Sequence, residues 1–207
     1  MKATRTLLAA LFVVIGLAGG AWFLALAWHG GSAPPEYATV LPVAQPLPAF
    51  TLTDEQGATL DRDALAGRWH LLFFGFTHCP DICPATLSQL AAARRQLQAN
   101  GQSPLPDILL ISVDPERDTP QVLARYVGRF GAGMRGATGS MDEVESLAAA
   151  LGIHFSAMSH HGGGDYDVNH SAAVLVVDPD VQLAALFSAP HSVAAFVSDL
   201  PRIIGAR

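Results

Sequence analysis

Apolar residues in this chain gather in short continuous runs that predict buried strands. The three strongest runs are residues 69–76 (WHLLFFGF), 107–113 (DILLISV) and 172–177 (AAVLVV). Runs this short, with no polar alternation, are typical of central strands that are covered on both faces. Weaker strand signals lie at residues 50–53 and 58–60, which flank the turn signal Glu55-Gln56-Gly57, and at residues 183–187, after Asp178-Pro179-Asp180.

Helical periodicity with start or stop signals marks four further segments. They are residues 84–99, which end at Asn100-Gly101; 120–130, with Thr119 as N-cap; 140–151, with a Ser140–Glu143 capping box; and 193–204, capped by Ser192. The resulting order is hairpin, β, α, β, α, α, β, β, α. It predicts an α/β fold with a mainly parallel sheet and helices on both faces, to which the closing β-hairpin adds antiparallel strands. This is the layout of a thioredoxin-like fold.

An uncharged apolar run precedes these elements, at residues 7–28. As a helix it is long enough to cross a bilayer, and Lys2 and Arg5 before it predict a cytoplasmic N-terminus. We therefore expect a single-pass transmembrane helix in the cell inner membrane, with the rest of the chain in the periplasm. A cleaved signal peptide is the competing interpretation. The run is longer than a usual signal core and has no clear small-x-small site.

The chain is thus expected to comprise a membrane anchor (1–28), a linker rich in Pro, Gly and Ser (29–49) and one folded domain (50–207). The formal net charge is −6, and Lys2 and Arg5 lie before the anchor, so the domain itself is more acidic still. This charge argues against binding to nucleic acid.

The only two cysteines, Cys79 and Cys83, lie between a predicted strand and a predicted helix, in GFTHCPDICP (75–84). A bridge between them would close a tiny loop and constrain the chain little, so redox chemistry or metal binding explains the pair better. We expect Pro84 at the first helical position and Cys83 near the N-cap, where the helix dipole favours a thiolate. A structural zinc site would need two histidines as well.

Two other segments precede or follow predicted strands at the same sheet edge. In VDPERDTP (113–120), Asp114 and Asp118 are expected to accept hydrogen bonds that hold the turn, with Arg117 paired to one of them. His170, in DYDVNHS (165–171), would alone be read as a surface histidine. Beside the cysteine pair it becomes a ligand candidate, because two thiolates and an imidazole suit copper.

The segments GFTHCPDICPATL (75–87), VDPERDTP (113–120) and NHSAAVLVVDP (169–179) resemble the Sco/SenC family, the copper chaperones of cytochrome c oxidase assembly. The resemblance extends from about residue 50 to the C-terminus. It implies one membrane anchor, a thioredoxin-like domain and a copper ion held by Cys79, Cys83 and His170. It also implies delivery of copper to the binuclear CuA centre of oxidase subunit II, or reduction of the cysteines of that centre, with a periplasmic copper donor or thiol reductant as a further partner.

Three features depart from the family pattern or stay open. Asn169 stands where the family often has Asp. An acid there would either orient the neighbouring imidazole or add charge near copper, so the departure is expected to change metal affinity. The pair His160-His161, followed by glycines, is either a solvated loop or a set of auxiliary copper ligands. His78 either tunes Cys79 or faces solvent.

Two functions therefore compete at the sequence level. The first is a metallochaperone that binds Cu(I) or Cu(II) through Cys79, Cys83 and His170. The alternative is a membrane-anchored thiol–disulfide oxidoreductase that acts on cysteines of the oxidase subunit or of other exported proteins, with Cys79 and Cys83 as the catalytic residues. Peroxide reduction is disfavoured, because Pro80 follows the first cysteine and a peroxidase would need an arginine at the thiolate. His170 discriminates the first two, since a reductase does not need it.

Overall fold

The computed structural model describes Gly20 and residues 33–157, 168–170 and 172–206, and residues from Pro34 to Gly205 form one compact unit. The described strands are β1 (Ala38–Pro46), β2 (Thr51–Asp54), β3 (Thr59–Asp61), β4 (His70–Gly75), β5 (Asp107–Ser112), β6 (Met134–Thr138), β7 (Phe155–Ala157), β8 (Val168–His170), β9 (Val174–Val177) and β10 (Gln182–Phe187). The described helices are α2 (Ile82–Ala99), α3 (Pro120–Val127), α4 (Met141–Ala150) and α5 (Val193–Gly205), with 3₁₀ turns at Asp63–Leu65 and Gly128–Phe130.

One mixed sheet organises this unit, with the strand order β1-β10-β9-β4-β5-β6-β2-β3. Strands β4 and β5 lie at its centre, and nearly every residue of both is buried, as their continuous apolar runs predict. Only the pairs β4–β5 and β5–β6 are parallel among the described strands of this sheet. The closing hairpin β9–β10 adds antiparallel strands, as predicted. The expectation that the rest of the sheet is mainly parallel is wrong, because β1, β2 and β3 also run antiparallel to their neighbours.

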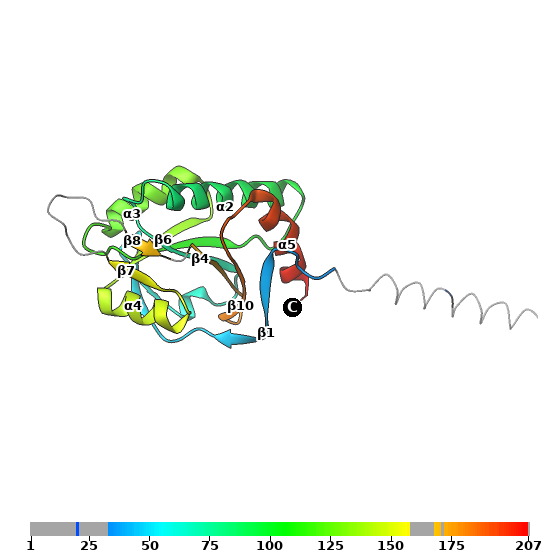
Figure 1. Ribbon diagram of the computed structural model, residues 1–207, viewed down its shortest axis with the longest axis horizontal. Helices are drawn as coiled ribbons and strands as arrows, with labels where there is room; N and C mark the ends of the chain where they lie inside the picture. Colours follow the sequence, from blue (N-terminus) through cyan, green and yellow to red (C-terminus); the bar gives the residue numbers. More distant parts are fainter. Residues whose placement is uncertain (1–19, 21–32, 158–167, 171, 207) are drawn as a thin grey trace, which may run out of the picture. The chain divides into compact units, whose positions relative to one another are not determined.

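Helices cover both faces of the sheet, as predicted. Helices α2, α3 and α5 lie on one face and α4 lies on the other (Figure 1). The predicted caps are present: the side chains of Thr119, Ser140 and Ser192 accept hydrogen bonds from the backbone N–H groups of Val122, Glu143 and Ala195. These layers form an α/β thioredoxin-like fold, which confirms the predicted fold class.

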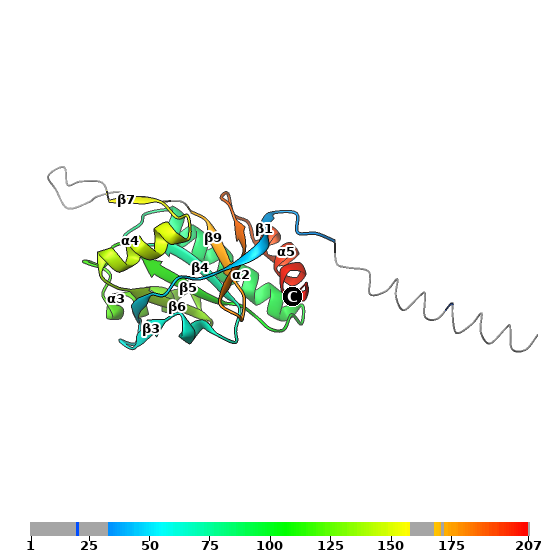
Figure 2. The same cartoon turned by 90° about the horizontal axis from the view of Figure 1, so that it is seen from below.

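Strand β1 lies within the segment 29–49, which was predicted to be a linker. It pairs with β10 at the edge of the sheet and runs beside α5 (Figure 2). The Asp199 carboxylate of α5 accepts the backbone N–H groups of Tyr37 and Ala38 at the start of β1. Burial alone would raise the pKa of Asp199, but hydrogen bonds from the backbone of residues 36–38 and from the side chain of Ser198 outweigh it and lower the pKa. Prolines misled the prediction, because an edge strand tolerates Pro42 and Pro46 where a central strand would not.

The sequence pattern also missed β6 and the small β7–β8 sheet. Strand β6 reads MRGAT, and its Arg and Gly interrupt the apolar run that would have marked a strand. Within the part of the chain that the structure describes, no helix has the length and apolar character needed to cross a membrane. The predicted anchor, apart from Gly20, and the pair His160-His161 lie outside the described residues.

Candidate metal centre

Three chain segments meet at one edge of the sheet. In the parallel pair β4–β5, Gly75 is opposite Ser112, so the loops that follow the two strands leave the sheet at the same level. Strand β9 runs antiparallel to β4, with Val174 opposite Phe73, so the segment before β9 reaches this edge from the other direction. Ligand sites of open α/β sheets form at such strand ends. The cysteines follow β4, the aspartates follow β5, and His170 precedes β9.

The two cysteines lie together at the start of α2. This helix begins at Ile82, two residues before the start that the sequence pattern predicts. Cys83 therefore lies in its first turn, and Pro84 is at the third helical position and not at the first. Proline is tolerated there because its missing N–H would have no partner within the helix. The backbone N–H of Cys83 donates to the Sγ of Cys79 at 3.4 Å. Neither cysteine is in a disulfide, and the exposed fraction is 8% for Cys79 and 0% for Cys83.

The electrostatic surroundings of Cys83 differ from the sequence-based expectation. A thiol near a helix N-terminus was expected to ionise readily, but burial raises the pKa of the Cys83 thiol, and its interaction with Cys79 raises it further. The prediction is wrong for Cys83 because the cost of burying a thiolate exceeds the stabilisation that the helix dipole supplies. Cys83 is thus a protonated, buried thiol until a cation or a bond replaces its proton.

Gly75, the last residue of β4, makes room for the sulfur of Cys83. A Cβ atom on Gly75 would lie 2.9 Å from Cys83 Sγ, 2.9 Å from a ring carbon of Phe73 and 3.3 Å from a methyl group of Leu110. Contacts this short are not tolerated without movement of the neighbours. Sequence reasoning gave Gly75 no role, although a glycine that ends a buried strand is a signal of close approach.

The loop after β5 is fixed to the cysteine loop through Asp118, whose side chain is buried. Its carboxylate accepts the N–H of Thr77 at 3.0 Å, the hydroxyl of Thr77 and the hydroxyl of Ser112 at 2.7 Å. Asp114 accepts from the guanidinium of Arg117. These bonds confirm the expected role of both aspartates in holding the turn. The role of Thr77 could not be predicted, because its partner Asp118 is 41 residues away in the sequence.

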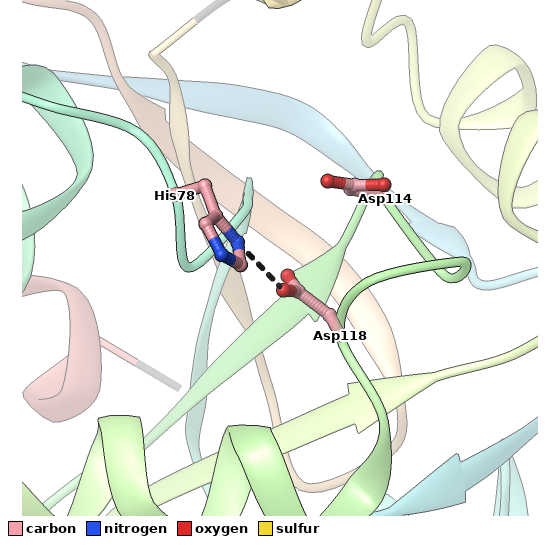
Figure 3. Close-up of side chains that lie close together, drawn as sticks. All are labelled: His78, Asp114 and Asp118. Carbon is pink, nitrogen blue, oxygen red and sulfur yellow. Dashed lines mark ion pairs between the residues drawn. The ribbon is translucent and has the colours of Figure 1, made fainter. Parts of the chain in front are cut away.

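Among the described residues, the ligand atoms of His78, Asp114 and Asp118 all lie within 4.8 Å of one another. Figure 3 shows the imidazole of His78 turned toward Asp118, with Nδ1 at 3.8 Å from the carboxylate and Asp114 beside them. The side chain of His78 is half exposed, and its Nδ1 also lies 3.1 Å from the hydroxyl of Thr77. Since the two carboxylates already accept from Thr77, Ser112 and Arg117, we interpret this cluster as a hydrogen-bonded network rather than as a cation site.

The structure describes the backbone of His170 but not its side chain. His170 ends β8 and is opposite Phe155 of β7. The following segment is held at Ala172, whose carbonyl accepts a hydrogen bond of 2.5 Å from Nε2 of His191. The ring of His191 in turn stacks on Phe196. No sequence signal singled out His191. The topology thus brings the chain around His170 to the sheet edge that carries the cysteines.

Comparison with known proteins agrees with this arrangement. The SCO1/SenC family model matches residues 42–205. A protein of Stutzerimonas stutzeri that is named for copper binding is 40% identical over 80% of each chain. The mitochondrial SCO2 homologue of Bos taurus is 37% identical over 76% of this chain, and the match spans only 59% of the bovine protein.

Among solved structures, the copper-bound ScoI of Arabidopsis thaliana superimposes with a TM-score of 0.72 at 34% identity. That superposition covers 77% of this chain and 98% of the Arabidopsis chain. The family model extends over most of the chain, including all three segments that meet at the sheet edge, and the Stutzerimonas protein is 40% identical over 80% of the chain. The chain therefore belongs to the SCO1/SenC family.

Proposed function

We propose that this chain is an exported copper chaperone that binds Cu(I) or Cu(II) through Cys79, Cys83 and His170. The observation that carries the proposal is the pair of cysteines, not joined in a disulfide, at one strand–helix junction, where the N–H of Cys83 contacts the sulfur of Cys79. Membership of the family and the copper bound to a relative of 34% identity support the choice of metal.

The donor set fits copper on chemical grounds. Thiolate sulfur selects Cu(I), and imidazole nitrogen is a good ligand for Cu(II), so two sulfurs and one nitrogen serve both oxidation states. Binding requires loss of both thiol protons, and the positive charge of the metal compensates for the burial of the sulfurs. A site of three ligands at a sheet edge, one of them on a separate chain segment, also lets the ion pass to a recipient.

The proposed setting is the periplasmic face of the inner membrane. Residues 1–28 would anchor the domain, and the recipient would be the CuA centre of cytochrome c oxidase subunit II. This part rests on the apolar run and on the family resemblance. Release of the full chain from membranes by alkaline carbonate would contradict the anchor.

Replacement of His170 tests the ligand set. His170→Ala is expected to abolish tight Cu(II) binding, because a third ligand is lost, while the reduced cysteine pair still reacts with thiol reagents. The measurement is competitive copper titration of the reduced domain, together with the rate of thiol alkylation. Oxidation of the cysteine pair to a disulfide is expected to abolish copper binding as well.

His154→Ala is the matched control, because His154 is an exposed histidine in the same half of the chain. It is expected to bind copper as the unmodified protein does. Equal copper affinity in the His170 variant and the unmodified protein would refute the proposed ligand set.

A thiol–disulfide oxidoreductase is the second candidate, and the contact between the two cysteines favours it. Cys79 is the more exposed thiol and would attack a disulfide of the partner. Cys83 would then displace the reduced partner and form the Cys79–Cys83 disulfide, so that two electrons and two protons pass to the partner. This function predicts that His170→Ala keeps full reductase activity toward a disulfide substrate.

A further inference from the structure

Asp118 is a fully buried carboxylate that connects the two loops at the edge of the sheet. One of its oxygens accepts the N–H of Thr77 and the hydroxyl of Ser112, and the other accepts the hydroxyl of Thr77. Thr77 lies two residues before Cys79, and Ser112 ends β5. The carboxylate thus joins the end of one parallel strand to the loop that follows its neighbour.

The position of Cys79 depends on this connection. The N–H of Cys79 lies at 3.4 Å from the carbonyl of Phe76, a long hydrogen bond that holds the loop weakly by itself. The three bonds at Thr77 and Ser112 are shorter and involve a charged acceptor, which makes each of them stronger than a neutral bond. The carboxylate of Asp118 therefore accepts the shortest of the described hydrogen bonds that hold the start of this loop.

The carboxylate of Asp118 also acts electrostatically on the thiol of Cys83. Among the described residues, the Asp118 carboxylate lies 3.8 Å from Nδ1 of His78, whereas Asp114 is the carboxylate that pairs with Arg117. A fixed negative charge in a buried environment stabilises a cation bound nearby more strongly than a charge in water would.

We propose that Asp118 is a positioning residue of the metal centre, which holds the cysteine loop in its binding geometry and adds a fixed negative charge beside the bound ion. The copper part of this inference rests on the proposed function. The positioning part does not, because the same bonds hold the cysteine pair in the metal-free protein.

Asp118→Asn tests the inference. An amide offers one acceptor oxygen where the carboxylate offers two, so at least one donor of Thr77 or Ser112 loses its partner, and the charge is removed. Copper affinity of the reduced protein is expected to fall about 10- to 100-fold, as is typical when a residue that supports a metal ligand is replaced. The backbone amide of Thr77 is expected to exchange with solvent faster in the metal-free variant, which NMR-detected hydrogen exchange measures.

Asp178→Asn is the matched control. Asp178 is a buried carboxylate that accepts the N–H groups of Asp180 and Gln182, but it follows β9 at the opposite end of the sheet, where Val177 is opposite His70. This variant is expected to lose thermal stability while it keeps its copper affinity and the slow exchange of Thr77. Equal losses of copper affinity in the two variants would reduce the role of Asp118 to general stability and overturn the proposal.

The failures of the two proposals are distinguishable. If the unmodified protein does not bind copper, the proposed function is wrong, and the exchange of Thr77 together with the alkylation rate of Cys79 still tests the positioning role. If the unmodified protein binds copper and Asp118→Asn binds it equally well, the inference about Asp118 is wrong and the proposed function stands. Unchanged exchange at Thr77 in Asp118→Asn also overturns the positioning role.

Discussion

At the scale of single residues, the cysteine pair depends on a neighbour that has no side chain. The sulfur of Cys83 lies fully buried against the last residue of β4, where a side chain larger than that of glycine does not fit. The position of the Cys83 sulfur is therefore determined by the packing at the end of β4 as well as by the place of Cys83 in α2.

Gly75→Ala is expected to lower both stability and copper affinity. Its Cβ would lie 2.9 Å from Cys83 Sγ and from the ring of Phe73, so the sulfur or the ring has to move. Overpacking of this kind costs about 1–3 kcal/mol of unfolding free energy. Urea unfolding of the metal-free protein and copper titration of the reduced protein measure the two effects.

Gly128→Ala serves as the control, because a Cβ at Gly128 meets no atom within 4 Å and the backbone there is helical. It is expected to leave copper affinity unchanged. If Gly75→Ala were as stable as the unmodified protein and bound copper equally well, the steric role of Gly75 would be disproved.

At the scale of elements, the centre depends on how loops are held at the ends of β4, β5 and β9. The strands themselves were predictable, because β4, β5 and β9 are continuous apolar runs, and parallel neighbours end at one edge. The bonds between the loops were not predictable from pattern, since Asp118 and its partner Thr77 are separated by all of α2 and β5.

His191 is expected to support copper binding, because it holds the segment that follows His170. His191→Phe keeps a ring to stack on Phe196 but removes the N–H that donates to the carbonyl of Ala172. Loss of one hydrogen bond worth about 1 kcal/mol is expected to weaken copper binding about fivefold. Competitive copper titration measures this loss.

The alkylation rate of Cys79 is expected to stay the same in His191→Phe, because the change affects a different segment. His191→Gln restores an N–H donor and is expected to recover part of the affinity. If His191→Phe bound copper as tightly as the unmodified protein, the hydrogen bond of His191 would have no role in copper binding.

At the scale of the whole molecule, a buried histidine makes stability depend on pH. His70 lies in the core at the start of β4, and its Nε2 contacts the carbonyl of Leu65 at 2.9 Å. Burial lowers the pKa of His70, and the hydrogen bond to Leu65 and the charge of Asp107 compensate only partly. The native state therefore keeps His70 neutral at pH values where the unfolded chain takes up a proton.

Stability is thus expected to fall as the pH drops below about 6.5, the ordinary pKa of histidine, and to go on falling until the lowered pKa of the native state is reached. His70 contributes at most about 1.4 kcal/mol per pH unit in this window. His70→Gln, which keeps a donor for Leu65, is expected to flatten the dependence. Urea unfolding of both proteins at pH 7.5 and 5.5 measures how the free energy of unfolding changes with pH. An equal change in the two proteins would exclude His70 as the cause.

The sequence by itself determined the α/β class, most strands and helices, the helix caps at Thr119, Ser140 and Ser192, and the cysteine motif. Apolar runs, capping side chains and short motifs are local features, because each depends only on residues that are close together in the sequence. The tertiary structure alone decided that β1 belongs to the sheet, that antiparallel strands flank its parallel centre on both sides, and that α2 begins at Ile82. It also decided that burial outweighs the helix dipole at Cys83, and that Asp118 and Gly75 shape the cysteine loop, because burial and long-range hydrogen bonds exist only after distant segments have packed together.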